Sequence, residues 1–228
     1  MRINIRKLFN NAASILGAAF FLQIIAPLAF AQRAYEDPSI KIHGQISINT
    51  DFAFSFMSTG PKRIRSSLTD ASAGSRITLY CWDNKLIMKS KLNGTIHYKE
   101  IEKEDSVSHY LDLTATSPYF FNVTEALEEF IDKLDTKFSI EIEISETAII
   151  DTEIYPINRI NLFRDEDDKK TLIRSIQYLD YMPELEPFLQ PKRLKFKNEI
   201  SGESGTITID KVELNSGLPN FLFELPNQ

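Results

Sequence analysis

The side chains best suited to binding a ligand lie along one predicted strand, residues 75–82. Alternate apolar residues predict that one face of this strand packs on the core. The opposite face then carries Arg76, Tyr80 and Trp82, the single tryptophan of the chain. Exposed aromatic rings beside polar groups can stack on sugar rings or anchor a protein partner. We therefore predict a ligand-binding face here, to which Tyr98 would add a ring; the alternative is that a helix or loop covers it.

Catalytic chemistry has weaker support in the sequence. Cys81 is the only cysteine and has the parity of the buried residues, so we expect a small buried side chain without an internal disulfide. The segment from Gly202 to Gly205 lacks the G-x-S-x-G spacing of a serine nucleophile and is typical of a polar hairpin turn. An acid–base pair could be hidden among the 32 carboxylates, but no neighbouring residue marks one. The sequence predicts a binding protein rather than an enzyme, with a hydrolase as an alternative.

The first residues have the pattern of an export signal. Three basic residues precede an apolar run from Ala12 to Phe30, which closes on the small residues Ala29 and Ala31 of a leader-peptidase site. We expect cleavage after Ala31; the alternative is a retained membrane anchor, because a span needs roughly 18–20 apolar residues. The leader holds three basic and no acidic residues, so cleavage would change 228 residues with a net charge of −6 into 197 residues with −9.

This export signal and the net charge limit the location and the partners. A cleaved leader predicts a periplasmic or secreted protein. A net acidic surface repels phosphate backbones and anionic lipid headgroups, so we expect neither nucleic acid nor an anionic membrane face as a partner; membrane attachment would follow only from a retained leader. About 200 residues can bury one hydrophobic core, which predicts a single domain over residues 32–228.

Alternation of apolar and polar residues predicts that most of the cleaved chain is β-strand. The strands are expected at 40–49, 75–82, 85–90, 92–101, 106–114, 137–146, 153–163, 192–198, 205–214 and 219–224. The first continues in the same parity through Phe52, Phe54 and Phe56 after a turn at 49–51. A polar loop is expected at 58–74 and a proline-rich connector at 183–191.

Two segments have helical periodicity. Asn122 and Glu125 resemble a capping box, and the apolar residues that follow recur at i, i+3, i+4 and i+7 as far as Leu134. A second helix is expected to begin at the acidic residues 165–168, and the apolar residues up to Leu179 have a similar spacing. Together the elements predict a mainly β fold: an antiparallel β-sandwich with two accessory α-helices.

The segment from Gly205 to Leu214 resembles the closing strand of galactose-binding-like jelly rolls, which include many carbohydrate-binding modules. Its hydrophobic parity changes near Asp210, as a β-bulge would cause. The segment from Phe121 to Leu127 is similar to a second element of these sandwiches. The resemblance implies a jelly-roll-like sandwich that binds a glycan or cell-envelope polysaccharide. It also implies that Asp210 helps to hold a structural calcium ion, and no other cofactor is expected.

A different resemblance lies near the start of the cleaved chain. Residues Ile40 to Ile46, with Gly74 to Ile77 further on, are similar to the first two strands of Gram-negative trimeric porins. That family implies a porin-like outer-membrane protein. A further alternative to glycan binding is a structural or protein-interaction role in the periplasm or at the surface, because a scaffold alone does not decide function.

Overall fold

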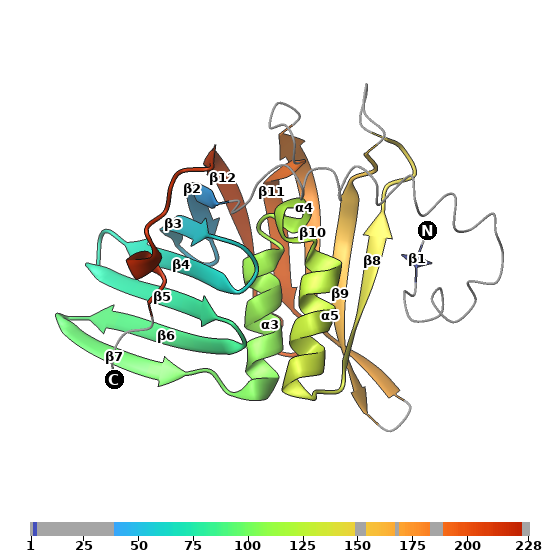
Figure 1. Cartoon of the computed structure of the whole chain (residues 1–228), viewed down its shortest axis with the longest axis horizontal. Helices are drawn as coiled ribbons and strands as arrows, with labels where there is room; N and C mark the ends of the chain where they lie inside the picture. Colours follow the sequence, from blue (N-terminus) through green and yellow to red (C-terminus); the bar gives the residue numbers. More distant parts are fainter. Residues whose placement is uncertain (1, 4–38, 149–153, 167–168, 183–188, 225–228) are drawn as a thin grey trace.

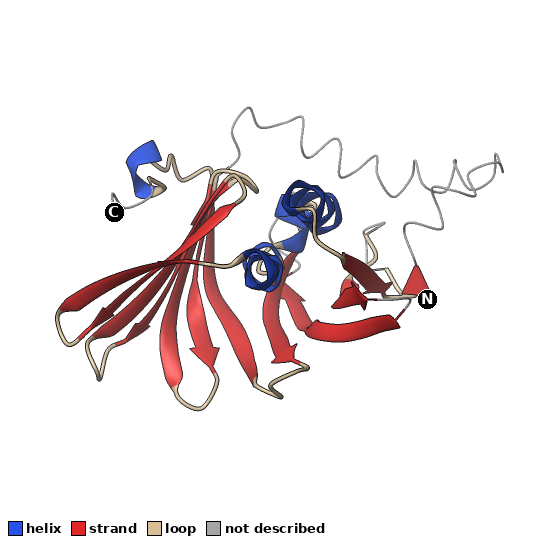
Figure 2. Ribbon diagram, turned by 90° about the horizontal axis from the view of Figure 1, so that it is seen from below, coloured by secondary structure: helices blue, strands red, loops and turns tan. Residues whose placement is uncertain are grey.

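The computed structural model describes residues 2–3, 39–148, 154–166, 169–182 and 189–224. These residues form one antiparallel sheet with helices on one of its faces (Figures 1 and 2). The predicted leader with its cleavage site after Ala31, and most of the predicted connector at 183–191, lie outside the described residues. Within the described part of the chain, no helix combines the length and the apolar character that a membrane crossing requires.

The sheet consists of two meanders that meet in its middle. The first contains β2 (Ile40–Ser47), β3 (Asp51–Ser58), β4 (Arg63–Asp70), β5 (Ser75–Trp82), β6 (Lys85–Leu92) and β7 (Thr95–Glu100). The second contains β8 (Phe138–Ile144), β9 (Ile157–Glu166), β10 (Lys169–Met182), β11 (Gln190–Asn198) and β12 (Ser204–Leu214). Strand β12 pairs with β2, so the order is β8-β9-β10-β11-β12-β2-β3-β4-β5-β6-β7, and the two-residue β1 (Arg2–Ile3) adds to β8.

The fold is mainly β, but the predicted jelly-roll sandwich is wrong. All strands of both meanders belong to one continuous open sheet, so there is no second sheet for it to pack on among the described residues. The second layer is instead helical: α3 (Lys103–Thr114), α4 (Pro118–Phe121) and α5 (Val123–Leu134) lie against the concave face of the curved sheet (Figure 2). The segments that suggested a porin lie in β2 and in the β4–β5 hairpin of this sheet.

The core fills the space between the concave face and the helices. Phe56 of β3 meets Phe121 of α4 edge-on, with 5.8 Å between ring centroids. In the helical layer, Tyr110 of α3 stacks on Phe130 of α5 at 4.0 Å. Aromatic side chains carry a large buried area, so these contacts attach the helices firmly to the sheet. The same packing covers the part of the inner face that lies beneath the helices.

Helix α5 confirms one of the two predicted helices. Its apolar stripe is buried, and the side-chain amide of Asn122 donates to Glu125 at 2.7 Å between Nδ2 and Oε2. Asn122 has a φ of 48°, a left-handed conformation that asparagine tolerates better than most residues. It ends α4 and precedes α5 at the same position, which turns the chain sharply between the two helices.

The predicted helix from 165 to 179 is wrong, because this segment forms the end of β9 and most of β10. The register with β9 shifts between Leu172 and Arg174, so Ile173 is an extra residue in a bulge. A bulge changes the parity of a strand, and Ile173 and Ile176 are therefore both buried although they are three residues apart. A bulged strand and a helix therefore produce the same spacing of buried residues in this segment. Asp167 and Asp168 lie outside the described residues.

Three further expectations are corrected. The predicted strand at 106–114 is part of helix α3, whose buried Val107, Tyr110, Leu111 and Thr114 have the i, i+3, i+4, i+7 spacing that alternate parity had concealed. The predicted loop at 58–74 contains strand β4, in which the outward positions are all polar and pair with the outward positions of β5. The predicted strand at 219–224 contains instead the short 3-10 helix η1 (Asn220–Leu222).

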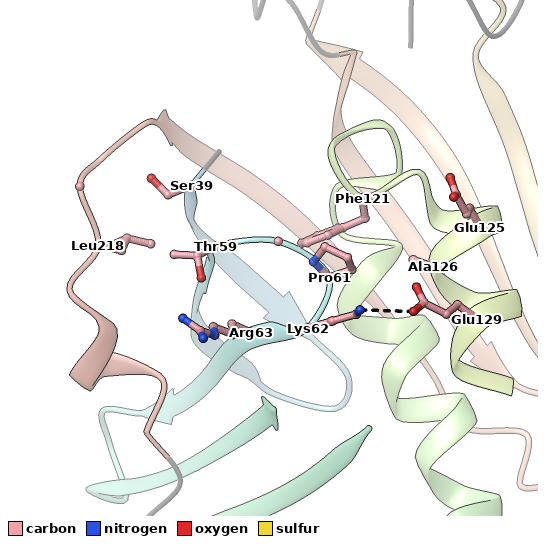
Figure 3. A pocket seen from close by; sticks show the side chains of 12 residues that line it. Ser39, Thr59, Pro61, Lys62, Arg63, Phe121, Glu125, Ala126, Glu129 and Leu218 are labelled. Carbon is pink, nitrogen blue, oxygen red and sulfur yellow. Dashed lines mark ion pairs between the residues drawn. The ribbon is translucent and has the colours of Figure 1, made fainter. Parts of the chain in front are cut away.

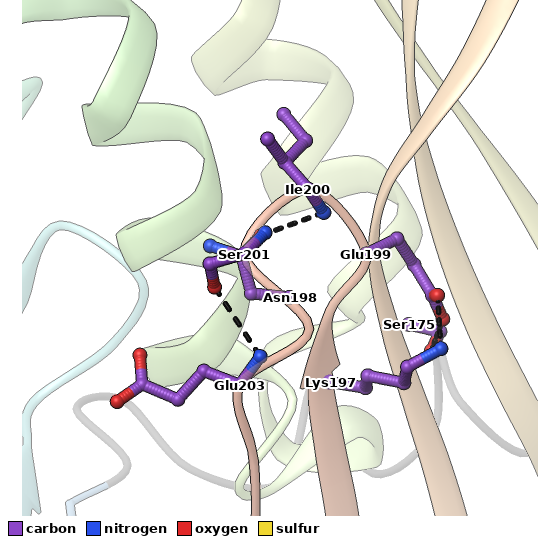
Figure 4. Close-up of polar contacts among 7 residues, drawn as sticks. All are labelled: Ser175, Lys197, Asn198, Glu199, Ile200, Ser201 and Glu203. Carbon is purple, nitrogen blue, oxygen red and sulfur yellow. Dashed lines mark hydrogen bonds and ion pairs between the residues drawn. The ribbon is translucent and has the colours of Figure 1, made fainter.

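Two local predictions around β12 are confirmed. The register with β2 shifts between Ile209 and Lys211, which places a bulge at Asp210. Gly202 and Glu203 belong to the hairpin turn between β11 and β12, and Ser204 and Gly205 begin β12. In this turn the Asn198 Oδ1 accepts from the backbone N–H groups of Ile200 and Ser201, at 3.0 Å each (Figure 4).

Candidate functional site

A polar pocket of about 720 Å³ opens at the rim between the sheet and the helical layer (Figure 3). The β3–β4 turn, the start of β2, helices α4 and α5, and the loop after β12 all contribute walls. The lining residues are Ser39, Thr59, Gly60, Pro61, Lys62, Arg63, Phe121, Glu125, Ala126, Glu129, Gly217 and Leu218. Because its walls come from segments far apart in the sequence, the pocket exists only in the complete fold.

The β3–β4 turn is held by hydrogen bonds on both sides. The Ser58 hydroxyl accepts from the Gly60 N–H at 2.9 Å and donates to the Gly60 carbonyl at 2.6 Å. Gly60 has a φ of 109°, which a side chain would make unfavourable. The Tyr110 hydroxyl of α3 donates to the Pro61 carbonyl at 3.0 Å. The turn is thereby fixed to the helical layer, which positions Lys62 and Arg63 at the pocket.

Charged groups of opposite sign meet across the pocket. The Lys62 ammonium lies 3.3 Å from the Glu129 carboxylate of α5, and Lys133 reaches the same carboxylate at 2.7 Å. Hydrogen bonds from Lys133 and Lys62 lower the pKa of Glu129. Pro61 and Leu218 supply apolar surface to the same pocket, and the buried Phe121 closes it towards the core. The arrangement offers a ligand both charged and apolar contacts.

The residues of the predicted ligand-binding face lie on the side of the sheet opposite the helices. Arg76 is exposed and donates to the Ser67 hydroxyl at 3.1 Å. Trp82 is half-buried, and the Arg63 guanidinium lies over its ring at 4.7 Å. Tyr98 is exposed, with the Lys89 ammonium 5.4 Å from its ring centroid. Arg63 therefore joins the predicted face to the pocket, since it lines the pocket and covers Trp82.

Tyr80 differs from its neighbours because it is only 7% exposed. The Arg65 guanidinium lies over its ring at 5.6 Å, and Arg65 also donates to the Leu222 carbonyl of η1 at 3.5 Å. The next residue, Phe223, is completely buried. The segment after β12 thus covers this part of the outer face, as the alternative to a ligand-binding face had foreseen for Tyr80.

Asp210 and Cys81 have contrasting surroundings. Asp210 is exposed at the β12 bulge, and no group of three or more His, Cys, Asp or Glu side chains suited to a metal ion occurs among the described residues. Calcium binding by Asp210 stays a prediction.

Cys81 is completely buried, as predicted, and burial raises the pKa of its thiol to about 12. A protonated, covered thiol is a poor nucleophile.

Comparison with known proteins gives a fold but no family. No family model matches the sequence, and no curated protein matches it. A solved structure described as an outer membrane lipoprotein-sorting protein domain, from Vibrio parahaemolyticus, is similar over 88% of this chain and 96% of that one, with 11% identity and a TM-score of 0.51. The chain shares the fold of that domain. The resemblance to galactose-binding-like jelly rolls is therefore wrong.

Two other solved structures are similar at lower scores. A LolA superfamily protein from Nitrosomonas europaea is similar over 89% of this chain and 97% of that one, with 11% identity and a TM-score of 0.47. A DUF1329 family protein from Desulfovibrio piger is similar over 88% of this chain and 97% of that one, with 13% identity and a TM-score of 0.46.

Sequence reasoning missed the pocket and its charged residues. Lys62 and Arg63 lay in a segment read as a polar loop, and Glu129 lay on the polar side of a predicted helix. Pairing Lys62 with Glu129 requires the order of elements in space, which no local pattern contains. The proline and glycine at 60–61 were the one available signal, because they mark a rigid turn beside two cationic residues.

Proposed function

We propose that this chain is a non-catalytic, periplasmic binding protein of the bacterial cell envelope, and that the pocket at the β3–β4 turn holds an amphiphilic envelope component. The observation that carries the proposal is the combination of Lys62 and Arg63 with the apolar surface of Pro61 and Leu218 in one open pocket. Small-molecule sites are concave and combine apolar walls with a few charged groups that orient the ligand.

The shared fold supports the same class of ligand. The Vibrio parahaemolyticus domain is described by a role in outer membrane lipoprotein sorting, and a lipoprotein presents an acyl chain next to a polar backbone. An amphiphile of this kind could place its polar end near Lys62 and its apolar end against Leu218. The packed core beneath the pocket favours a ligand held at the rim.

The state of the charged groups favours binding over catalysis. Two lysines lower the pKa of Glu129, which keeps this carboxyl ionised at neutral pH and makes it a weak proton donor. The Cys81 thiol is buried away from the pocket surface and stays protonated. These groups therefore fit the recognition of a charged ligand better than a proton-transfer or nucleophilic role.

The test uses lyso-phosphatidylglycerol, an amphiphile with one acyl chain and an anionic headgroup. Trp82 is the single tryptophan and lies under Arg63, so its fluorescence reports on the pocket wall. We expect a saturable fluorescence change in the wild-type protein. Leu218→Glu should weaken binding at least tenfold, because it places a like charge on the apolar wall, whereas Leu179→Glu on β10 should bind as the wild type does.

Mass spectrometry of organic extracts from the purified protein supplies an independent measurement. A bound envelope amphiphile that is lost in the Leu218→Glu protein would agree with the proposal. If no amphiphile co-purifies and lyso-phosphatidylglycerol leaves Trp82 fluorescence unchanged, the pocket does not bind this class of ligand.

Glycan binding is the second hypothesis and now depends on the outer face alone. Trp82 and Tyr98 share that face, and the ring of Tyr98 is accessible. Tyr80 contributes little surface, and Arg63 occupies one side of Trp82. Retention on a polysaccharide affinity gel that Trp82→Ala abolishes would favour this hypothesis. A protein partner whose binding survives Trp82→Ala would favour the interaction role.

A further inference from the structure

Basic side chains are concentrated on the outer face of β4–β7. The strands β4–β7 pair without register shifts, so residues that are paired across neighbouring strands lie on the same face of the sheet. The pairing therefore shows which residues point outward. The basic residues at the outward positions are Arg63, Arg65, Arg76, Lys85, Lys89 and Lys91. Glu100 is the one acidic residue at these positions, all of which the structure describes. A chain with a net charge of −6 thus has one strongly cationic face.

Apolar side chains are exposed at the free end of the same strands. Leu92 is 51% exposed and Ile96 is 47% exposed, and they lie on opposite sides of the β6–β7 hairpin. Ile77 on β5 and Tyr98 on β7 are also exposed large hydrophobic residues of this region. Four of the eight such residues among those described therefore lie in β5–β7. Figure 1 shows this end of the sheet projecting beyond the helices.

The basic and apolar residues occur in the same rows. Arg76, Lys91 and Ile96 are paired across β5, β6 and β7, and Lys89 and Tyr98 are paired in an adjacent outward row. Within the described residues, neither Arg76 nor Lys91 forms an ion pair with a carboxylate. Unpaired cations around exposed apolar side chains are the arrangement that binds an anionic bilayer, where the cations contact headgroups and the apolar groups enter the interface.

We propose that the free end of β5–β7 docks on an anionic phospholipid surface, with Leu92 and Ile96 of the β6–β7 hairpin entering the interface. The net charge of the chain predicts repulsion from such a surface, but it averages over charges that the fold segregates. A cationic face near the bilayer is attracted over about 8 Å at physiological ionic strength, whereas acidic residues on other faces are screened. The free end of β5–β7 is separate from the pocket, which the cationic face reaches only through Arg63 at the other end of β4.

The first experiment measures co-sedimentation with vesicles of equimolar phosphatidylglycerol and phosphatidylcholine, and with vesicles of phosphatidylcholine alone. We expect binding to the anionic vesicles and much weaker binding to the neutral ones. The double variant Arg76→Glu/Lys91→Glu should bind at least tenfold more weakly, since each Lys or Arg near such a surface changes affinity about fivefold. The matched control Lys192→Glu/Lys195→Glu changes two exposed lysines of β11 and should bind as the wild type does.

The second experiment locates the contact. An environment-sensitive fluorophore on Thr95→Cys reports on the β6–β7 hairpin, and the same fluorophore on Ser201→Cys reports on the β11–β12 turn (Figure 4). Cys81 is buried, so labelling is confined to the new cysteine. Anionic vesicles should shift the emission of the hairpin label to the blue and leave the control label unchanged. All variants are purified in the same form as the wild-type protein.

Three results would overturn the proposal. Equal binding to neutral and anionic vesicles would remove the role of the cationic face. An unshifted hairpin label would show that Leu92 and Ile96 stay in water. The third result concerns the double variant Leu92→Ser/Ile96→Ser. If this variant still binds inorganic polyphosphate and binds vesicles as the wild type does, the surface is a site for soluble polyanions instead. Circular dichroism confirms the fold of each variant before these comparisons.

Discussion

The Arg174 guanidinium of β10 contacts both carboxylate oxygens of Asp112 in helix α3, with 2.8 Å between Nε and Oδ1. The Arg174 side chain is 12% exposed, and its guanidinium also lies over the ring of Phe196 at 4.9 Å. Two parallel hydrogen bonds fix orientation as well as distance. This pair therefore connects the helical layer to the middle of the second meander.

Loss of Arg174 should destabilise the fold substantially. Arg174→Met leaves the Asp112 carboxylate in a poorly solvated position without its partner, and we expect the free energy of unfolding to fall by about 2–3 kcal/mol. Urea denaturation followed by circular dichroism measures this change. Arg193→Met is the control, because the Arg193–Asp180 pair is largely exposed and should contribute less than about 1 kcal/mol. Equal losses for both variants would contradict the structural role of the Arg174–Asp112 pair.

The Cys81 thiol should be unreactive until the protein unfolds. Burial raises its pKa from 9.0 to about 12, so a thiol reagent at pH 8 should label the folded chain far more slowly than the chain in urea. The folded state keeps the proton that the unfolded state releases, so stability falls as pH rises above about 9. The slope attributable to one such group is at most about 1.4 kcal/mol per pH unit. Cys81→Ala should reduce this dependence; rapid labelling of the native protein would contradict the burial.

Phe223 should stabilise the cover over the outer face. Phe223→Ala removes a fully buried ring, and we expect a loss of about 3 kcal/mol if the site cannot collapse. The exposed Phe221 in the same segment provides the control, since Phe221→Ala should cost little. Quenching of Trp82 fluorescence by iodide should increase in Phe223→Ala because the neighbouring Arg65 and Tyr80 lose their cover. A variant as stable as the wild type would show that the segment is only loosely attached.

Gly44 should not tolerate a side chain. A Cβ atom at this position would lie 2.1 Å from the backbone oxygen of Thr208, and backbone atoms cannot move aside as a flexible side chain can. We expect Gly44→Ala to destabilise the protein by at least about 2 kcal/mol, through separation of β2 from β12. Ala53→Gly on β3 is the comparison, because it measures the intrinsic difference in stability between alanine and glycine in a strand, about 1 kcal/mol. Thermal unfolding measures both, and a neutral Gly44→Ala would mean that the strands are further apart.

Sequence patterns predicted the elements whose local signal was unambiguous. Strand β5 and helix α5 were found because alternation and helical spacing were regular there. The signal failed where two structures produce the same spacing, as for Ile173 and Ile176 in bulged β10. It also failed for α3, where Val107 and Leu111 have both strand parity and helical spacing.

The layering and the candidate site lay beyond local patterns for a different reason. A strand that packs on helices and a strand that packs on a second sheet have the same alternation of apolar and polar residues, so sandwich and open sheet were indistinguishable. Strand parity placed Arg76 and Trp82 on one face, but that Tyr98 shares this face follows only from the pairing across β6, and the burial of Tyr80 depends on the segment that ends near Phe223. Such contacts over long sequence distances are set by the whole fold.

The pairing of β12 with β2 has a consequence for how the chain folds. Ile40 lies directly opposite Leu214, so the sheet is completed by contacts between its first and last full strands, and high contact order slows folding. In space, the strands from β8 to β12 are followed by those from β2 to β7, so each strand except β7 and β8 lies beside the next strand in the chain or across the β12–β2 pair. The helices connect β7 to β8, which lie at opposite ends of this order. A circular permutant that joins the end of β12 to the start of β2 and opens the chain before β8 would keep every pair among β2–β12, make the β12–β2 pair local in sequence, and fold faster.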